Sequence, residues 1–138
     1  MAENEGVGSD SEKRLLALRR QAEQGGGAER LQAQHARGKL SARERIAELV
    51  DPGSFQELGG LMQHRVSEFG MDAQRYLGDG LVAGFATIGS RQVCLYAQDF
   101  TVLGGSVGEV AGRKLARLMD TAMEAGVPVI ALNAGGGT

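Results

Sequence analysis

Two strand-like stretches in the second half of the chain carry the clearest local pattern. The runs GLVAGFATI (80–88) and RQVCLYAQ (91–98) are rich in β-branched, aromatic and small apolar residues. Only Gly89 and Ser90 separate them, and a glycine that takes a positive φ permits a two-residue turn. The pattern therefore predicts an antiparallel hairpin. A third run, VPVIAL (127–132), is apolar throughout and predicts a strand buried on both faces of a sheet.

A long amphipathic helix is predicted between the hairpin and this last strand. Residues 107–125 place apolar side chains at steps of three and four. Ser106 and Glu109 have the spacing of a capping box, in which the serine oxygen accepts the amide hydrogen of the third helical residue. Gly126 stands where a left-handed residue commonly ends a helix. The sequence thus predicts a strand, helix, strand succession from 91 to 132.

The first 50 residues predict three shorter helices. One contains Leu15, Leu16 and Leu18 and ends before the triple glycine 25–27, and a second spans about 28–36. A third begins at Ala42 behind the capping box SARE and stops at DPG (51–53), because proline cannot continue the helix. Residues 55–76 predict one weak strand. Residues 1–10 are polar and aperiodic and predict a disordered tail, which leaves 11–138 as one domain.

Composition narrows the possible functions. The 138 residues carry a formal net charge of -2, which gives no general attraction to nucleic acid. One cysteine and two distant histidines cannot build a zinc site or a disulfide scaffold, so no metal is expected. No apolar run is long enough to span a membrane, and the N-terminus lacks the features of a secretion signal. We therefore expect a cytoplasmic protein that binds neither membrane nor nucleic acid; a nucleic-acid module in the basic segment 11–50 is a distant alternative.

The segment GGSVG (104–108) matches the G-x-S-x-G pattern of a hydrolase nucleophile. In that class of enzyme the histidine base follows the serine, whereas both histidines of this chain precede it. The capping box would also occupy Ser106. A serine nucleophile is therefore disfavoured, and no phosphate-loop motif of the G-x-x-x-x-G-K-[ST] type is present.

Two other features have the chemistry of a binding site. The cluster HARGK (35–39) puts Arg37 and Lys39 between two predicted helices, where the pair could hold a phosphate or pyrophosphate. A solvated basic turn explains the same residues about equally well. The glycine-rich end of the chain, 133–138, follows a strand at the position where open α/β sheets bind ligands, and its amides could face an oxyanion.

Four segments carry a resemblance to a known family: GKLSARERI (38–46), DPGSF (51–55), GDG (78–80) and QDFTVLGGSVGE (98–109). From about Ser11 to Thr138 the chain resembles the N-terminal part of the carboxyltransferase (beta) subunit of biotin-dependent acyl-CoA carboxylases, of the propionyl-CoA and acetyl-CoA type. The resemblance implies an α/β fold of the crotonase class, a superhelix of β-β-α units, incomplete here and preceded by N-terminal helices.

The resemblance also implies a reaction. The carboxyl group of carboxybiotin, carried by a partner alpha subunit or domain, moves to the α-carbon of a short acyl-CoA through a thioester enolate that backbone amides stabilise. Arg37 and Lys39 would then hold the phosphates of CoA, and Gly135, Gly136 and Gly137 would border the thioester. A second oxyanion glycine pair is expected beyond Thr138. We therefore expect the 138 residues alone to be inactive, and the beta subunits to form a homo-oligomer.

One departure from the family pattern favours an alternative. The family usually continues the last strand as NDSGGAR, or as a GAGAR variant, whereas this chain reads NAGGGT (133–138), with Ala134 in the place of the aspartate. The alternative is a non-catalytic remnant that binds CoA or another subunit.

Overall fold

The computed structural model of the protein describes residues 8–60, 63 and 76–135. The elements in chain order are α1 (Asp10–Glu23), α2 (Ala28–Ala36), α3 (Ala42–Leu49), β1 (Gln56–Leu58), β2 (Leu81–Ile88), β3 (Arg91–Gln98), the short 3₁₀ helix η2 (Leu103–Gly105), α4 (Glu109–Ala125) and β4 (Val129–Leu132).

The described strands form one sheet in the order β1-β2-β3-β4. The first two pairings are antiparallel and the pairing of β3 with β4 is parallel. The predicted hairpin is confirmed: Ile88 faces Arg91, and Gly89 and Ser90 both have positive φ, as a primed two-residue turn requires. The weak strand expected in 55–76 is β1, and residues 61–62 and 64–75 of that range lie outside the described residues.

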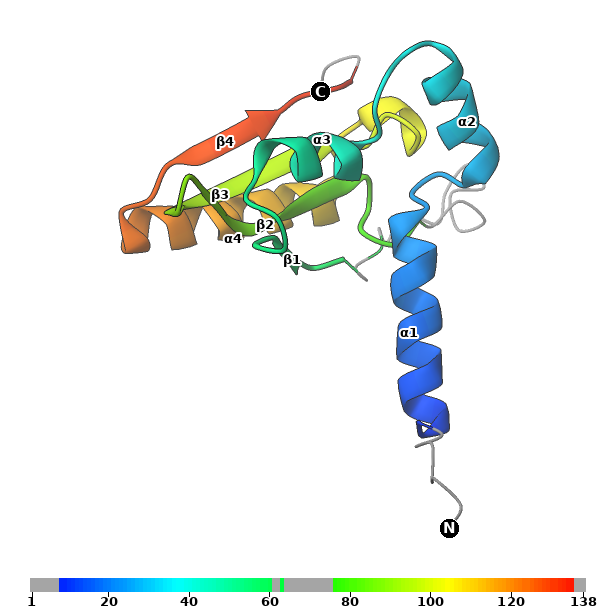
Figure 1. The fold of residues 1–138 in the computed structure, drawn as a ribbon, viewed down its shortest axis with the longest axis horizontal. Coiled ribbons are helices and arrows are strands. Elements are labelled where there is room, and N and C mark those ends of the chain that lie inside the picture. Colours follow the sequence, from blue (N-terminus) through cyan, green and yellow to red (C-terminus); the bar gives the residue numbers. More distant parts are fainter. Residues whose placement is uncertain (1–7, 61–62, 64–75, 136–138) are drawn as a thin grey trace.

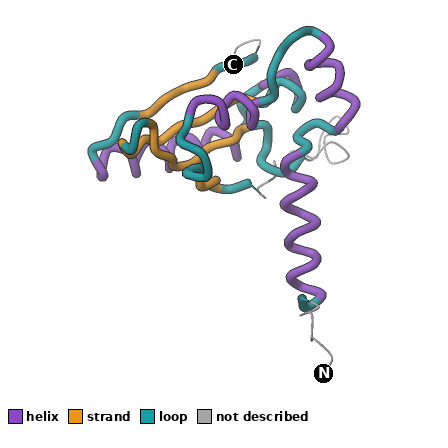
Figure 2. Tube along the Cα trace, in the orientation of Figure 1, coloured by secondary structure: helices purple, strands orange, loops and turns teal. Residues whose placement is uncertain are grey.

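Helices cover the two faces of the sheet (Figures 1 and 2). On one face, α3 contributes Ala42 and Ile46 to a core that includes Leu95 and Ala97 of β3. On the other face, α4 contributes Ala111, Leu118 and Ala122 to a second core, which includes Leu81, Ala83 and Cys94 of the hairpin. This burial raises the pKa of the Cys94 thiol, because a thiolate is disfavoured in apolar surroundings.

The N-terminus of α4 differs from the prediction. The helix begins at Glu109 behind Gly108, and the predicted capping box of Ser106 is wrong, because Ser106 is the residue that ends η2. A carboxylate from a distant turn replaces it: Oδ2 of Asp79 accepts a hydrogen bond from the amide of Ala111 at 3.0 Å. The GDG turn therefore caps α4, while the left-handed Gly126 ends the helix as predicted.

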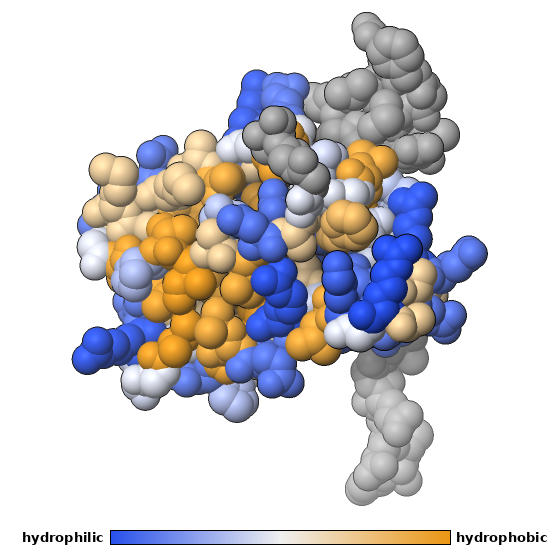
Figure 3. All heavy atoms as spheres, turned by 90° about the horizontal axis from the view of Figure 1, so that it is seen from above, coloured by the Kyte–Doolittle hydropathy of each residue, from blue (hydrophilic) through white to orange (hydrophobic). Residues whose placement is uncertain are grey.

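The last strand is less buried than its sequence suggests. Ile130 and Leu132 pack against the core on the α3 side, but Val129 is 38% exposed. The prediction of burial on both faces is wrong for this chain, because β4 is the edge of the described sheet and pairs only with β3. Figure 3, which views the molecule from above Figure 1, shows apolar side chains gathered over the left half of this side.

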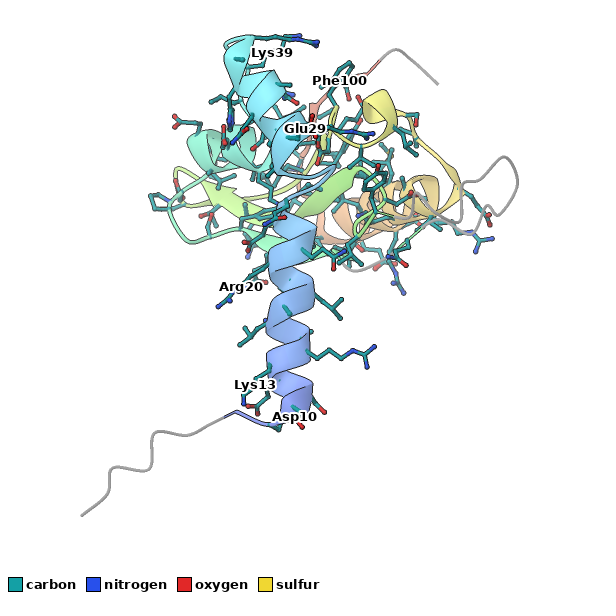
Figure 4. The ribbon with its side chains drawn as sticks, turned by 90° about the vertical axis from the view of Figure 1, so that its right-hand side faces the viewer. Asp10, Lys13, Arg20, Glu29, Lys39 and Phe100 are labelled. Carbon is teal, nitrogen blue, oxygen red and sulfur yellow. The ribbon has the colours of Figure 1, made fainter. Side chains whose placement is uncertain are left out.

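Helix α1 points away from the sheet (Figures 1 and 4). It starts at Asp10 because Ser9 and Glu12 form a capping box, so the disordered tail predicted for residues 1–10 extends too far. Residues 1–7 of that tail lie outside the described residues. Ala22, near the end of α1, is its single buried residue.

Among the described residues, no helix combines the length and the apolar character needed to cross a membrane.

Candidate functional site

The carboxyl ends of β3 and β4 lie at the same edge of the sheet because the two strands are parallel. The backbones that leave these strands meet. The amide of Ala134 donates to Oε1 of Gln98 at 2.8 Å, and a Cβ placed on Gly105 would lie 2.0 Å from the carbonyl oxygen of Ala134. A Cβ on Gly135 would likewise lie 2.8 Å from the carbonyl oxygen of Gly105. Two glycine-containing loops are therefore in direct backbone contact at this edge.

Helix α2 is fastened to the same edge through the turn after β3. The amide of Gly26 donates to Oγ1 of Thr101 at 3.0 Å, and Nη1 of Arg30 donates to the carbonyl oxygen of Thr101 at 3.2 Å. Asp99 holds Thr101 in turn, by accepting from its amide at 2.9 Å. The triple glycine was predicted only to end a helix. It also lets the backbone at Gly26 lie against the backbone of Thr101, because a Cβ on Gly26 would lie 1.9 Å from Thr101 O.

A cavity of about 280 Å³ lies between α2 and the turn after β3. Its lining includes the predicted Arg37 and Lys39, together with Arg30, Ala33, Gln34, Phe100, Thr101 and Gly104. Figure 4 shows Lys39 and Phe100 at the same upper end of the molecule. The structure therefore brings the two predicted cations into a concave site and adds residues that the sequence analysis did not select.

The three cations of the cavity differ in how firmly they are held. Arg30 donates to the hydroxyl of Tyr76 at 3.2 Å, and its guanidinium carbon lies 5.8 Å from the centre of the Tyr76 ring. Arg37 and Lys39 are exposed, and among the described residues no acidic group lies within 4.0 Å of either. Positive charge is thus available at this site for an anionic ligand.

The neighbouring histidine of the same basic cluster is paired instead. Nε2 of His35 lies 2.7 Å from Oε1 of Glu44, which links α2 to α3. The pKa of Glu44 is lowered, first by the hydrogen bond from the backbone of Ser41 and further by His35. His35 therefore belongs to the scaffold that carries Arg37 and Lys39.

The predicted glycines of the last loop fall partly within the described residues. Gly135 does not line the cavity. A Cβ placed on Gly135 would lie 3.5 Å from the carbonyl oxygen of Gly104, and Gly104 is a lining residue. Gly136 and Gly137 lie outside the described residues. The structure thus connects the cation site to the beginning of the predicted oxyanion loop through Gly104 and Gly105.

The G-x-S-x-G segment has no catalytic geometry in the described part of the chain. Ser106 is exposed, and His35 is engaged with Glu44. A serine needs an adjacent base to act as a nucleophile, so the structure agrees with the rejection of this reading. One ground for that rejection, the use of Ser106 as a helix cap, was nevertheless incorrect.

Comparison with known protein families identifies the family of this chain. The model of the carboxyl transferase domain matches residues 33–138. The chain belongs to the carboxyl transferase domain family. The match includes α3, the whole sheet and both cations predicted from the basic cluster.

Curated members of the family are similar over most of this chain. The propionyl-CoA carboxylase beta chain of Cereibacter sphaeroides is 52% identical over 113 residues, which is 82% of this chain and 22% of the relative. The mitochondrial propionyl-CoA carboxylase beta chain of Homo sapiens is 47% identical over 127 residues, or 91% of this chain and 24% of the relative. The chain therefore spans about a quarter of the length of the curated relatives it matches.

A solved structure supports the fold. Transcarboxylase 12S, described as a hexamer with methylmalonyl-coenzyme A and methylmalonic acid bound, matches with a TM-score of 0.89 and 40% identity. The match covers 99% of this chain and 27% of the transcarboxylase chain. The expected α/β fold of the crotonase type, with N-terminal helices and a partial sheet, is confirmed, and β2, β3 and α4 form its β-β-α unit.

The remaining motifs of the carboxyl transferase resemblance have structural roles. DPGSF binds the hairpin, since the carboxylate of Asp51 accepts from Oγ1 of Thr87 at 2.7 Å and from the amides of Gly89 and Ser90. The GDG turn caps α4 and receives Lys114, whose Nζ donates to Gly78 O at 2.7 Å. Of the four motifs, the cavity draws its residues from the beginning of GKLSARERI and from QDFTVLGGSVGE.

Proposed function

We propose that this chain is the acyl-CoA-binding part of a biotin-dependent carboxyltransferase. In this proposal residues 11–138 form one domain, and the reaction moves a carboxyl group to the α-carbon of a short acyl-CoA such as propionyl-CoA or acetyl-CoA. The observation that carries it is the cavity at the carboxyl end of β3, whose lining includes Arg30, Arg37 and Lys39. Arginine and lysine without acidic partners suit the phosphates of CoA.

The thioester end of the substrate is assigned to the loop after β4. Backbone amides that are fixed before the reaction stabilise the negative charge that develops on a thioester oxygen when the α-carbon loses its proton. The amides of Gly135, Gly136 and Gly137 are proposed to border that oxygen. The contact of Gly135 with the Gly105 backbone supports the assignment, because it fixes the start of this loop beside the cavity.

Carboxybiotin is proposed to arrive on a partner alpha subunit or domain. The cavity described here has three cationic side chains in its lining, and the proposal assigns them to the phosphates of CoA. No step of the reaction is therefore assigned to biotin on these residues. Assembly into a homo-oligomer of beta subunits is proposed because the similar transcarboxylase 12S is described as a hexamer.

Titration of the 138-residue chain with CoA tests the phosphate assignment. The double variant Arg37→Ala, Lys39→Ala is expected to lose at least tenfold in affinity, about 1.4 kcal/mol, by isothermal titration calorimetry. The matched control is Arg20→Ala, Arg91→Ala, which removes two exposed cations that do not line the cavity. Equal CoA affinity in both double variants would show that the phosphates bind elsewhere.

The alternative is a non-catalytic relative that binds CoA or another subunit. Ala134, in the place of the aspartate usual in the family, favours it. Reading the coding region past codon 138 separates the two proposals. An open frame that encodes a further glycine pair supports the enzyme, whereas a stop codon supports the binding protein.

A further inference from the structure

Helix α1 is held by the rest of the described molecule at one end. Ala22, in the last turn, is its single buried residue, and the helix extends from there away from the sheet (Figures 1 and 4). A helix of 14 residues is marginally stable in water on its own, because few hydrogen bonds offset the cost of nucleation. The projecting turns of α1 would therefore gain stability from a contact with another polypeptide.

The apolar side chains of α1 form a seam beside a hollow. Leu15, Leu18 and Ala22 follow one another at steps of three and four, which is the spacing of a coiled-coil seam. Leu15 is 40% exposed. A cavity of about 370 Å³ lies next to this seam and is lined by Leu15, Arg19, Ala22, Glu23, Glu57 and Gly60. The seam therefore borders a space that has room for side chains of a second helix.

Charged residues beside the seam favour one orientation of a paired helix. Glu12 and Arg19 are both exposed, stand seven residues apart on the same flank, and form no ion pair within 4.0 Å among the described residues. In an antiparallel pair of α1 helices, Leu15 of one copy packs against Leu18 of the other. This register brings Glu12 of each copy opposite Arg19 of the other. A parallel pair would instead place Arg14 opposite Arg19, which are like charges.

We propose that α1 pairs with α1 of a second copy of this chain as an antiparallel two-helix coiled coil. The partner is a second copy because the helix is complementary to itself, and a twofold axis forms each charge pair twice. The inference rests on the homo-oligomer of the proposed function and names a surface for it, apart from the CoA cavity. The seam spans only about two heptads, so the dimer should form in a concentration-dependent equilibrium.

Two comparisons with known proteins bear on this surface. The carboxyl transferase domain matches residues 33–138, so α1 lies outside the matched domain. The match to transcarboxylase 12S covers 99% of this chain and therefore includes α1, and that protein is described as a hexamer. A helix outside the matched domain that is shared with an oligomeric relative fits a role in assembly.

Sedimentation equilibrium of the 138-residue chain over a series of concentrations tests the seam. Leu15→Glu is expected to weaken self-association by about tenfold or more, because it places an unpaired charge among apolar side chains. Leu16→Glu is the matched control, since Leu16 is 51% exposed on the same helix but lies outside the seam. Its neighbours one turn away are all charged: Glu12, Lys13, Arg19 and Arg20. This variant should associate within about twofold of the wild type.

Charge reversal tests the antiparallel register. Arg19→Glu is expected to weaken association by about fivefold, because Glu12 of the other copy then faces a carboxylate in each of two exposed pairs. The same variant should associate more tightly as salt is added, whereas the wild type should associate less tightly. Glu12→Lys combined with Arg19→Glu restores opposite charges and should recover most of the affinity. Circular dichroism verifies that each variant keeps its helix content, since Glu12 also accepts from the amide of Ser9.

The outcomes distinguish this inference from the proposed function. Association that is equal in Leu15→Glu and Leu16→Glu shows another surface or a non-specific contact, which overturns the pairing of α1 but leaves the homo-oligomer proposal intact. A wild-type chain that stays monomeric at every concentration also overturns the pairing. Failure of the charge reversal to recover affinity overturns the antiparallel register. CoA titration is independent of these results: CoA that fails to bind the wild-type chain overturns the proposed CoA site and leaves the pairing to be decided by sedimentation.

Discussion

Both ends of the β2–β3 hairpin carry glycine and polar motif residues, but these residues have different roles at the two ends. At the turn end, the carboxylate of Asp51 accepts three hydrogen bonds, from Thr87, Gly89 and Ser90, at 2.7, 2.9 and 2.8 Å. At the other end, Arg37 and Lys39 face a cavity without acidic partners in the described part of the chain. One end satisfies its polar groups internally, and the other leaves charge available.

This difference separates a motif that stabilises the fold from a motif that is proposed to bind a ligand. Motif residues are present at both ends, so their presence alone does not say which end binds a ligand. Hydrogen bonding within the protein distinguishes the two ends. A side chain whose polar atoms already form internal hydrogen bonds has few donors or acceptors available for a ligand. We call the turn end, held by Asp51, the closed end and the cavity end the open end. Substitutions at the closed end should change stability without changing affinity, whereas substitutions of the exposed cations Arg37 and Lys39 at the open end should change affinity. Groups buried beneath the open end are expected to change stability.

The largest effect on stability is expected beneath the open end, at Lys114. This side chain is only 2% exposed, and its Nζ donates to the carbonyl oxygens of Gly59, Gly78 and Leu81. Lys114→Met keeps the bulk but leaves these buried acceptors without their donor, and it should cost about 3 kcal/mol in the free energy of unfolding by urea. Arg113→Met, an exposed cation one residue earlier, should cost less than about 0.5 kcal/mol.

The pH dependence of stability provides a second measurement of the same lysine. Burial lowers the pKa of Lys114 from 10.5 to about 8. The unfolded chain therefore binds more protons than the native one between these values, and the free energy of unfolding should rise as pH increases from about 8 to 10.5. The gain disappears as pH falls through 8. If the free energy of unfolding rose with pH equally in wild type and Lys114→Met between pH 8 and 10.5, Lys114 would not be the group that causes the rise.

Local signals in the sequence predicted the elements on which the site is built. The second helix was predicted at the bounds of α2, and the hairpin and the cap of α3 were found, because each depends on neighbouring residues. The cap of α4 was misassigned because its carboxylate, Asp79, lies 32 residues from the amide that it accepts. Burial of β4 was overestimated because composition does not reveal which strand forms the edge of the sheet.

The candidate site was predicted only where its residues are close in sequence. Arg37 and Lys39 stand in one basic cluster and could be selected together. Arg30 was not selected from the sequence, since its partner Thr101 lies 71 residues away. Phe100 was quoted within a family motif but given no role, because its exposure follows from the burial of both neighbours. Three-dimensional proximity was therefore the missing information.

A smaller effect is expected from crowding the loop contact at the open end. Gly105 has a φ of 74°, and its Cβ would lie 2.0 Å from Ala134 O. Gly105→Ala should cost about 2 kcal/mol, from backbone strain and displacement of residues 133–135. It should also weaken acyl-CoA binding by shifting Gly135. Gly53→Ala is the matched control, since Gly53 has a similar φ of 73° and no atom lies within 4 Å of its Cβ position. This variant should lose only the backbone-strain contribution, about 1 kcal/mol of stability.

The smallest effect is expected at the closed end, where solvent can replace part of what is lost. Asp51→Asn keeps the shape of the side chain but removes the charge that accepts from the amides of Ser90 and Gly89. It should lower the melting temperature while leaving CoA affinity unchanged, and Asp10→Asn on α1 is the control. The pKa of Asp51 is lowered, mainly by the hydrogen bond from the Ser90 amide and further by Thr87 and Gly89.

This shift fixes the direction of the pH dependence at the closed end. Because the pKa of the folded state lies below the unfolded value of 3.8, the stabilisation by Asp51 is fully present above that value and is lost as pH falls through the folded pKa. The melting temperatures of wild type and Asp51→Asn should therefore converge in acid. A CoA affinity that changes with Asp51→Asn at neutral pH would contradict the division of the hairpin into a stabilising end and a binding end, because no cavity residue contacts this turn.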